Sequence, residues 1–254
     1  MFKSFRLQVL ALIVGSLLVP AALSAGTIVN LELLLLVDVS GSVDASEYNL
    51  QKTGYVNAFK SAAIQTAIAN SPGGIAVAYG VWSTFNQQNL QVAWTHVTDA
   101  ASANAFANLI AATTQIFGNS TAPGSAINWG VSLFASNAYD GTFKTIDISG
   151  DGAQNAGDDT STAAAAAWAA GIKVNGLPIL GDEANLQTWY QTNIVTPGHG
   201  QLWVADSFAD FGTAVTAKIG QEISDPGGAV PEPGTWAMLG GGLALLALWR
   251  RRLA

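Results

Sequence analysis

Three polar stretches of the sequence carry oxygen atoms of the kind that bind hard divalent cations. Asp38, Ser40 and Ser42 alternate along one short stretch, Asp-Val-Ser-Gly-Ser, whereas Thr121 and Asp151 come much later in the chain. Magnesium takes about six oxygen ligands in an octahedron and gives up its waters reluctantly. The three hydroxyls are therefore candidates for direct contact with such an ion. The two carboxylates are candidates for holding its water molecules, which leaves much of its positive charge unneutralised.

Each stretch taken alone also has a simpler interpretation. Asp-x-Ser-Gly-Ser ahead of a helix is typical of an Asx or Ser turn with a helix N-cap. The stretch around Asp151, Gly-Asp-Gly, is typical of a turn, and a hydroxyl such as that of Thr121 is common near the start of a helix. The metal-site hypothesis depends on whether the fold brings all three stretches together.

The hydrophobic pattern predicts alternating strands and helices. Residues 28–38 are predicted to form a strand buried on both faces of a sheet, because the apolar run at 33–37 shows no alternation. Further strands are predicted at 75–82 and 90–94, which form a hairpin, and at 143–149, 172–180 and 201–205. Helices are predicted from an acidic cap at 44–47 to about residue 70, and at 100–113, 124–136, 159–170 and 207–223.

This order of elements predicts the fold class and the place of the polar stretches. Helical connections between strands imply crossovers, a mostly parallel sheet and helices on both faces, so we expect one doubly wound α/β domain over residues 26–225. In such a sheet, ligands bind outside the carboxyl ends of the strands. Asp38 is at the end of one predicted strand, Asp151 follows another, and Thr121 precedes a helix. The three polar stretches are therefore expected to meet at one edge, on surface loops rather than in the core.

In this order, the three stretches resemble the metal-ion-dependent adhesion site (MIDAS) of the von Willebrand factor A (vWA) domain, a D-x-S-x-S loop supported by a distant threonine and a distant aspartate. Asp38, Ser40 and Ser42 match the loop, and Thr121 and Asp151 match the distant positions. Other stretches, at 172–179 and 205–211, look like a bacterial branch of the family, a domain of unknown function. The resemblance implies a vWA/Rossmann-like fold, a bound Mg²⁺ (or Mn²⁺ or Ca²⁺), and an open coordination position that accepts a carboxylate from a partner.

The N-terminal residues have the three-part pattern of a secretory signal. Lys3 and Arg6 precede an apolar run over residues 7–22 and a small-residue patch that ends at Ala25. The alternative is a membrane anchor that is kept, but the run is shorter than the ~20 residues of a spanning helix. We expect residues 1–25 to be a signal peptide and the chain to be exported.

The C-terminal residues look like a second targeting signal. Pro231, Glu232 and Pro233 precede an apolar stretch at 235–249 and three arginines at 250–252, and arginines beside a span favour the cytoplasmic side. This order resembles the PEP-CTERM sorting signal of Gram-negative bacteria. The resemblance implies that residues 231–254, after a linker at 226–230, hold a short transmembrane segment that an exosortase cleaves. The protein would then be transiently anchored in the membrane and end at the cell surface or in the extracellular matrix.

The charge of the predicted mature part excludes some partners. Residues 26–230 contain five lysines, no arginine and 16 acidic residues, a net charge of −11. Nucleic acids and anionic membranes bind basic surfaces, so we expect neither as a partner apart from the membrane contact of the sorting tail. A cation is the natural partner of an acidic surface, although acidity can also serve solubility alone.

Other chemistry finds little support in the sequence. The chain has no cysteine, which excludes disulfides, thiolate zinc sites and cysteine nucleophiles. His96 and His199 have no recognisable partner. The loop at 151–159 lacks the EF-hand spacing, so it is more typical of a helix cap than of a calcium site.

Three classes of function remain. We expect an exported binding module, not an enzyme, that uses a divalent metal to bind an acidic group on a protein or extracellular polymer. The first alternative is a structural component of the extracellular matrix whose metal only stabilises the loops. The second is a hydrolase with Asp38 or Ser40 as nucleophile, but the chain lacks a G-x-S-x-G elbow, a Ser-His-Asp set and the D-x-D pattern of aspartyl-phosphate enzymes.

Overall fold

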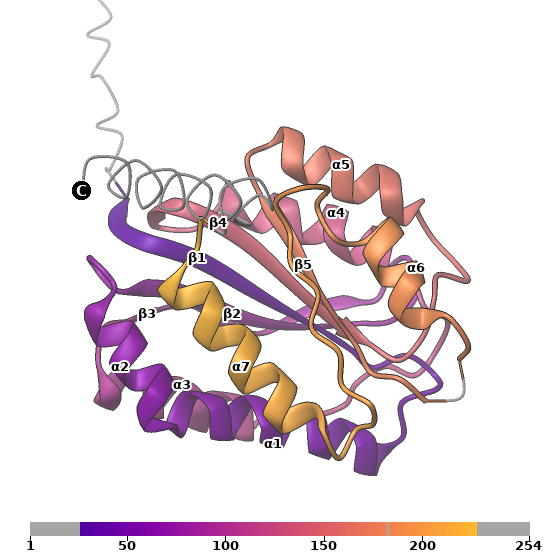
Figure 1. The fold of residues 1–254 in the computed structure, drawn as a ribbon, viewed down its shortest axis with the longest axis horizontal. Coiled ribbons are helices and arrows are strands. Elements are labelled where there is room, and N and C mark those ends of the chain that lie inside the picture. The colour runs from indigo at the N-terminus through magenta and orange to yellow at the C-terminus, as the bar shows by residue number, and fades with distance from the viewer. Residues whose placement is uncertain (1–25, 182, 228–254) are drawn as a thin grey trace, which may run out of the picture.

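The apolar run at 33–37 lies in β1 (Thr27–Asp38), at the centre of a five-stranded sheet. The structure is a computed structural model that describes residues 26–181 and 183–227 (Figure 1). The other strands are β2 (Ile75–Trp82), β3 (Gln88–Val97), β4 (Tyr139–Gly150) and β5 (Lys173–Pro178). The strand order is β3-β2-β1-β4-β5, and only the β2–β3 pair is antiparallel. The predicted doubly wound, mostly parallel α/β fold is confirmed.

Helices cover both faces of the sheet (Figure 1). They are α1 (Ala45–Lys60), α2 (Ala62–Asn70), α3 (Ala100–Ala111), α4 (Pro123–Phe134), α5 (Thr160–Ala169), α6 (Leu186–Asn193) and α7 (Phe211–Ser224). Successive side chains of a strand point to opposite faces. Leu33 and Leu35 of β1 accordingly pack against α1, α2, α3 and α7, whereas Leu34 and Leu36 pack against α4, α5 and α6. The absence of alternation in the sequence of β1 reflects this double burial.

The first predicted helix is two helices in the structure. The capping box expected at its start is present, because Asp44 accepts the N–H of Glu47 and Glu47 accepts the N–H of Asp44. Ser61 then adopts an extended backbone, which ends α1, and its hydroxyl accepts the N–H of Ile64 in α2. The prediction of one helix to residue 70 was wrong because a single serine caps a new helix there.

The region after β5 also differs from the prediction. Residues 201–205 form only isolated parallel bridges, Gly176 with Leu202 and Ile179 with Ala205, instead of a sixth strand. Helix α6 was not predicted. Its polar sequence starts at Asn185, which adopts a left-handed backbone and makes no side-chain cap, so the usual start signal is missing.

The parallel strands β1, β2 and β4 end at the same edge of the sheet. Asp38 of β1 pairs with Trp82 of β2, and Val37 pairs with Ser149 of β4. The loops that follow these strands therefore emerge side by side. The predicted signal peptide and sorting signal lie outside the described residues. Within the described part, no helix has the length and apolar character needed to cross a membrane.

Candidate metal centre

The end of β1 places Asp38 inside the protein. The side chain is fully buried, and its Oδ1 accepts the backbone N–H of Ser40 at 2.7 Å. Its backbone carbonyl accepts a hydrogen bond from Nε2 of Gln51, on α1, at 3.1 Å. The expectation that Asp38 lies on a surface loop was wrong, because it is the last residue of a central strand and α1 packs against it.

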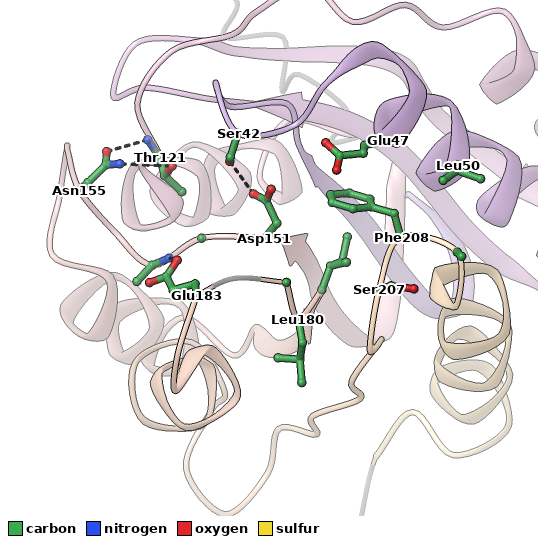
Figure 2. Close-up of a pocket in the computed structure, with 15 residues that line it drawn as sticks. Ser42, Glu47, Leu50, Thr121, Asp151, Asn155, Leu180, Glu183, Ser207 and Phe208 are labelled. Atoms are coloured by element: carbon green, nitrogen blue, oxygen red, sulfur yellow. Dashed lines mark hydrogen bonds between the residues drawn. The ribbon is translucent and has the colours of Figure 1, made fainter.

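The three predicted stretches meet at the carboxyl edge of the sheet. Ser40 Oγ lies 3.3 Å from Ser42 Oγ and 3.3 Å from Thr121 Oγ1. The Ser42 hydroxyl donates to Asp151 Oδ1 at 2.7 Å. Together with Asp38, which accepts from the backbone of Ser40, these side chains form one hydrogen-bonded group that we call the hydroxyl–carboxylate cluster. Figure 2 shows Ser42 and Asp151 facing each other beside Thr121.

Backbone contacts fix the loops that carry the cluster. The N–H of Gly41 donates to the carbonyl of Asn119 at 2.6 Å, and an added Cβ on Gly41 would lie 3.3 Å from that oxygen. Ser83, the first residue after β2, donates its hydroxyl to the carbonyl of Ser120 and accepts the N–H of Asn119. The loop before Thr121 is thus held against both β1 and β2.

Asn155, which was not among the predicted site residues, joins the second and third stretches. Its side-chain oxygen accepts the N–H of Thr121 at 2.8 Å, and its own N–H donates to the Thr121 carbonyl at 3.0 Å. Further along the same loop, Asp159 caps α5 by accepting the N–H of Thr162. The helix cap expected in the loop at 151–159 is therefore present. The role of Asn155 had no signal in the sequence, because it depends on the approach of two distant loops.

The electrostatics of the cluster favour a cation. Burial raises the pKa of Asp38 to about 8, the negative charge of Asp151 adds to this, and the N–H of Ser40 acts against it. Burial also raises the pKa of Asp151, the hydrogen bond from Ser42 lowers it, and the charges of Glu47 and Glu183 raise it. A positive charge placed here would be attracted by several carboxylates at once.

A pocket of about 680 Å³ opens beside the cluster. Ser42, Thr121, Asp151 and Asn155 line one part of it, and Leu50, Ile179, Leu180 and Phe208 provide apolar walls. Figure 2 shows Asp151 with Glu47 on one side and Glu183 on the other. Among the described residues that line the pocket there is no lysine, arginine or histidine.

The residues of the cluster fit a hard divalent cation. Three hydroxyls and two carboxylates are oxygen donors of the kind that Mg²⁺, Mn²⁺ and Ca²⁺ prefer. Asp38 Oδ2 is buried and has no hydrogen-bond partner among the residues that the structure describes, which leaves an acceptor available for an ion's water ligand. In the described part of the chain, no group of three or more His, Cys, Asp and Glu side chains is placed to hold a metal. A metal site at the cluster would therefore include hydroxyls among its ligands.

The sequence is similar to known families over most of its length. Residues 28–227 match the family described as "Protein of unknown function (DUF1194)", and residues 229–252 match the PEP-CTERM protein-sorting motif. No curated protein matches the sequence.

Solved structures with the same fold come from varied surface and matrix proteins. Proximal thread matrix protein 1 from the mussel byssus has a TM-score of 0.56 and 16% identity, over 76% of this chain and 47% of that one. Another structure of the mussel protein has a zinc-occupied MIDAS motif. The pilus adhesin SpaC from Lactobacillus rhamnosus GG has a TM-score of 0.56 and 17% identity, over 78% and 30% of the two chains. A von Willebrand factor type A protein from Catenulispora acidiphila has a TM-score of 0.54 and 14% identity, over 76% and 42%. This chain thus spans about half the length of the mussel protein, and the likeness shows a vWA-type fold.

Proposed function

Because this chain belongs to the DUF1194 family and carries a PEP-CTERM protein-sorting motif, we propose that it is an exported, non-enzymatic binding module that holds a divalent cation at the hydroxyl–carboxylate cluster. One observation carries the proposal. Three loops that are far apart in the sequence bring three hydroxyls and two carboxylates into a single hydrogen-bonded group at the carboxyl edge of the sheet.

The residues of the cluster divide into two roles. Ser40, Ser42 and Thr121 would contact the ion through neutral hydroxyls, and Asp38 and Asp151 would accept hydrogen bonds from its water ligands. Because no carboxylate contacts the ion directly in this arrangement, a bound cation would supply an electrophilic position for an acidic ligand. Mg²⁺ suits this donor set, and Mn²⁺ and Ca²⁺ use the same oxygen ligands. The zinc-occupied MIDAS of the mussel protein supports the idea that sites of this type also accept other divalent ions.

The ligand that we propose is an acidic group on a protein or an extracellular polymer. The pocket beside the cluster has room for such a group together with part of its carrier. Glu47 and Glu183 at the pocket repel an acid in the absence of the ion, so binding should depend strictly on the metal. The apolar walls formed by Leu50, Leu180 and Phe208 would favour a ligand with apolar groups beside its acid.

The cellular route follows from the two ends of the sequence. The PEP-CTERM motif implies processing by an exosortase, and the N-terminal signal implies export. We propose that the mature domain resides at the cell surface or in the extracellular matrix of a Gram-negative bacterium. The vWA-fold neighbours, an adhesin and a byssus matrix protein, support a role of this kind.

The geometry gives little support to a hydrolase. His96 contacts the carbonyl of Gly73, and His199 stacks on Trp168, so neither imidazole reaches Ser40. A structural matrix role is the alternative that deserves a test, because hydrogen bonds already join the three loops. In that case the metal would bind and stabilise the loops, but no partner would depend on it.

Calorimetric titration of Mg²⁺, Mn²⁺ and Ca²⁺ into metal-free residues 26–230 tests the proposal. We expect about one ion per chain, and Ser42→Ala should weaken its affinity by roughly tenfold or more. Ser207→Ala is the matched control, because Ser207 lines the same pocket but its hydroxyl donates to Asp210. Absence of binding to the wild-type protein would refute the metal proposal.

Ligand binding is tested separately with acidic peptides and acidic polysaccharides, each in the presence of Mg²⁺ and in the presence of a chelator. Binding that the chelator abolishes supports the binding module. Metal binding without any metal-dependent ligand supports the structural alternative.

A further inference from the structure

Among the buried polar atoms that have no hydrogen-bond partner in the described part of the chain, two lie beside Gly150. One is Asp38 Oδ2, and the other is the hydroxyl oxygen of Tyr190, on α6. Both side chains are fully buried. Buried polar groups that lack a partner cost free energy, so native structures pair nearly all of them.

The two oxygens face the same small space beside Gly150, the last residue of β4. A Cβ atom added to Gly150 would lie 2.6 Å from Asp38 Oδ2 and 2.8 Å from the Tyr190 hydroxyl oxygen. The oxygens are therefore close enough for a small rotation of the carboxylate, or one bridging water molecule, to join them. Any side chain at position 150 would fill this space.

The ring of Tyr190 is held in one place. It belongs to the core between the sheet and helices α4, α5 and α6, and an added Cβ on Gly176 would lie only 3.0 Å from its Cδ1 atom. Its neighbour Trp189 packs edge-on to it, with the ring centroids 5.7 Å apart. A tyrosine hydroxyl can donate a hydrogen bond to an ionised carboxylate and can accept one from a neutral carboxyl, so it can pair with either form of Asp38.

We propose that Tyr190 is a positioning residue of the cluster, whose hydroxyl hydrogen-bonds to Asp38 Oδ2 directly or through one water molecule. This contact leaves Oδ1 oriented to accept the N–H of Ser40, so it fixes the carboxylate and the start of the Ser40–Ser42 loop together. The effect on metal affinity rests on the proposed function, whereas the contact itself belongs to the metal-free protein.

The position of α6 gives this contact a second consequence. Ile179, Leu180, Gly181 and Glu183, which lie between β5 and α6, line the pocket beside the cluster. This segment forms a wall of the ligand pocket, and it leads into α6, the helix that carries Tyr190. Tyr190 thus connects the hydroxyl–carboxylate cluster with the pocket wall that precedes α6.

The test compares Tyr190→Phe with Tyr79→Phe in the protein as exported. Tyr79 is also fully buried, but it lies on β2 and its hydroxyl is near those of Tyr48 and Thr113. The first measurement is amide hydrogen exchange at Ser40 in metal-free protein. We expect exchange to be about tenfold faster in Tyr190→Phe and unchanged in Tyr79→Phe. Unchanged exchange at Ser40 in Tyr190→Phe would overturn the proposal.

The second measurement is calorimetric Mg²⁺ affinity, which should fall about tenfold in Tyr190→Phe and stay within about twofold of wild type in Tyr79→Phe. A merely structural role of Tyr190 would lower the melting temperature without changing the affinity, and that result would also count against the proposal. If exchange at Ser40 responds as expected but the wild-type protein binds no metal, the contact is supported and the proposed function fails.

Discussion

At the scale of single residues, Asp38 differs most from its expected environment. Its type and spacing predict an exposed loop ligand, whereas the structure buries it at the end of a central strand. Burial raises its pKa to about 8, so in metal-free protein at neutral pH the carboxyl is mostly neutral. Replacing Asp38 by alanine therefore removes little buried charge. The main effect on stability is the loss of the hydrogen bond from the Ser40 N–H to the Asp38 carboxyl.

This environment leads to a prediction about two aspartates of the same cluster. Asp38→Ala should lower the free energy of unfolding of metal-free protein by roughly 1–3 kcal/mol, because the buried N–H of Ser40 loses its acceptor. Asp151→Ala should cost clearly less, since Asp151 is only partly buried on its loop. Urea denaturation at pH 7 with a chelator measures both values. If both variants lost the same free energy of unfolding, the prediction that the buried Asp38 contributes more than the partly buried Asp151 would be wrong.

The spacing of residues and the resemblance to the MIDAS were sufficient to nominate five side chains, and the structure brings all five together. Their supports could not be predicted in the same way. Asn155 acts through contacts between two loops, and Tyr190 lies on a helix without a start signal in the sequence. Residues of this kind are found only when the tertiary structure places them.

At the scale of elements, α7 is attached to the sheet by buried charges as well as by apolar contacts. Lys218 forms ion pairs with Asp147 of β4 and, at 2.8 Å, with Glu222 of the same helix. Glu222 also accepts a hydrogen bond from Asn175 of β5 at 2.6 Å. Each of the three charged side chains is almost completely buried. The closing helix was predicted from its apolar pattern, but this network joins residues that are far apart in the sequence.

The network predicts a pH dependence of stability. Burial raises the pKa of Asp147 from 3.8 to about 7, while Lys218 opposes the shift and Glu222 adds to it. A folded-state pKa above the unfolded value means that the folded protein binds the proton more tightly. The stabilisation that protonated Asp147 provides is thus fully present below about pH 4 and is lost as the pH rises through about 7.

Asp147→Asn should therefore reduce the loss of stability between pH 5 and pH 8. Asp38 contributes with the same sign, so the difference between wild type and variant isolates Asp147. Chemical denaturation at the two pH values measures it. An identical pH dependence in both proteins would show that Asp147 is not the group responsible.

The elements themselves were predictable where a start or stop signal was local. The apolar run of β1 and the capping box of α1 are examples. The break at Ser61 was missed because a serine at that point is compatible with both a continuous and an interrupted helix. The segment at 201–205 has the composition of a strand, yet it forms only two isolated bridges, one to Gly176 of β5 and one to Ile179, the residue after β5.

At the scale of the whole molecule, an acidic domain is joined to a C-terminal sorting motif at residues 229–252. Deletion of residues 231–254 should leave the domain folded, because the described core ends before them. The same deletion should remove the protein from the surface fraction of its producing cells. Cell fractionation and immunoblotting of both forms measure this, and unchanged surface attachment would refute the role proposed for the tail.

The two ends of the described chain lie together at the amino edge of the sheet. Gly26 packs against Tyr139 at the start of β4, and Gly227 lies near Phe143 of the same strand (Figure 1). The cluster is at the other end of β1, a strand of 12 residues that spans roughly 40 Å. If the domain is tethered through the chain that follows Gly227, the length of the domain itself separates the pocket from the point of attachment. The domain would hold its pocket outward, at the side farthest from the tether, where a passing partner reaches it first.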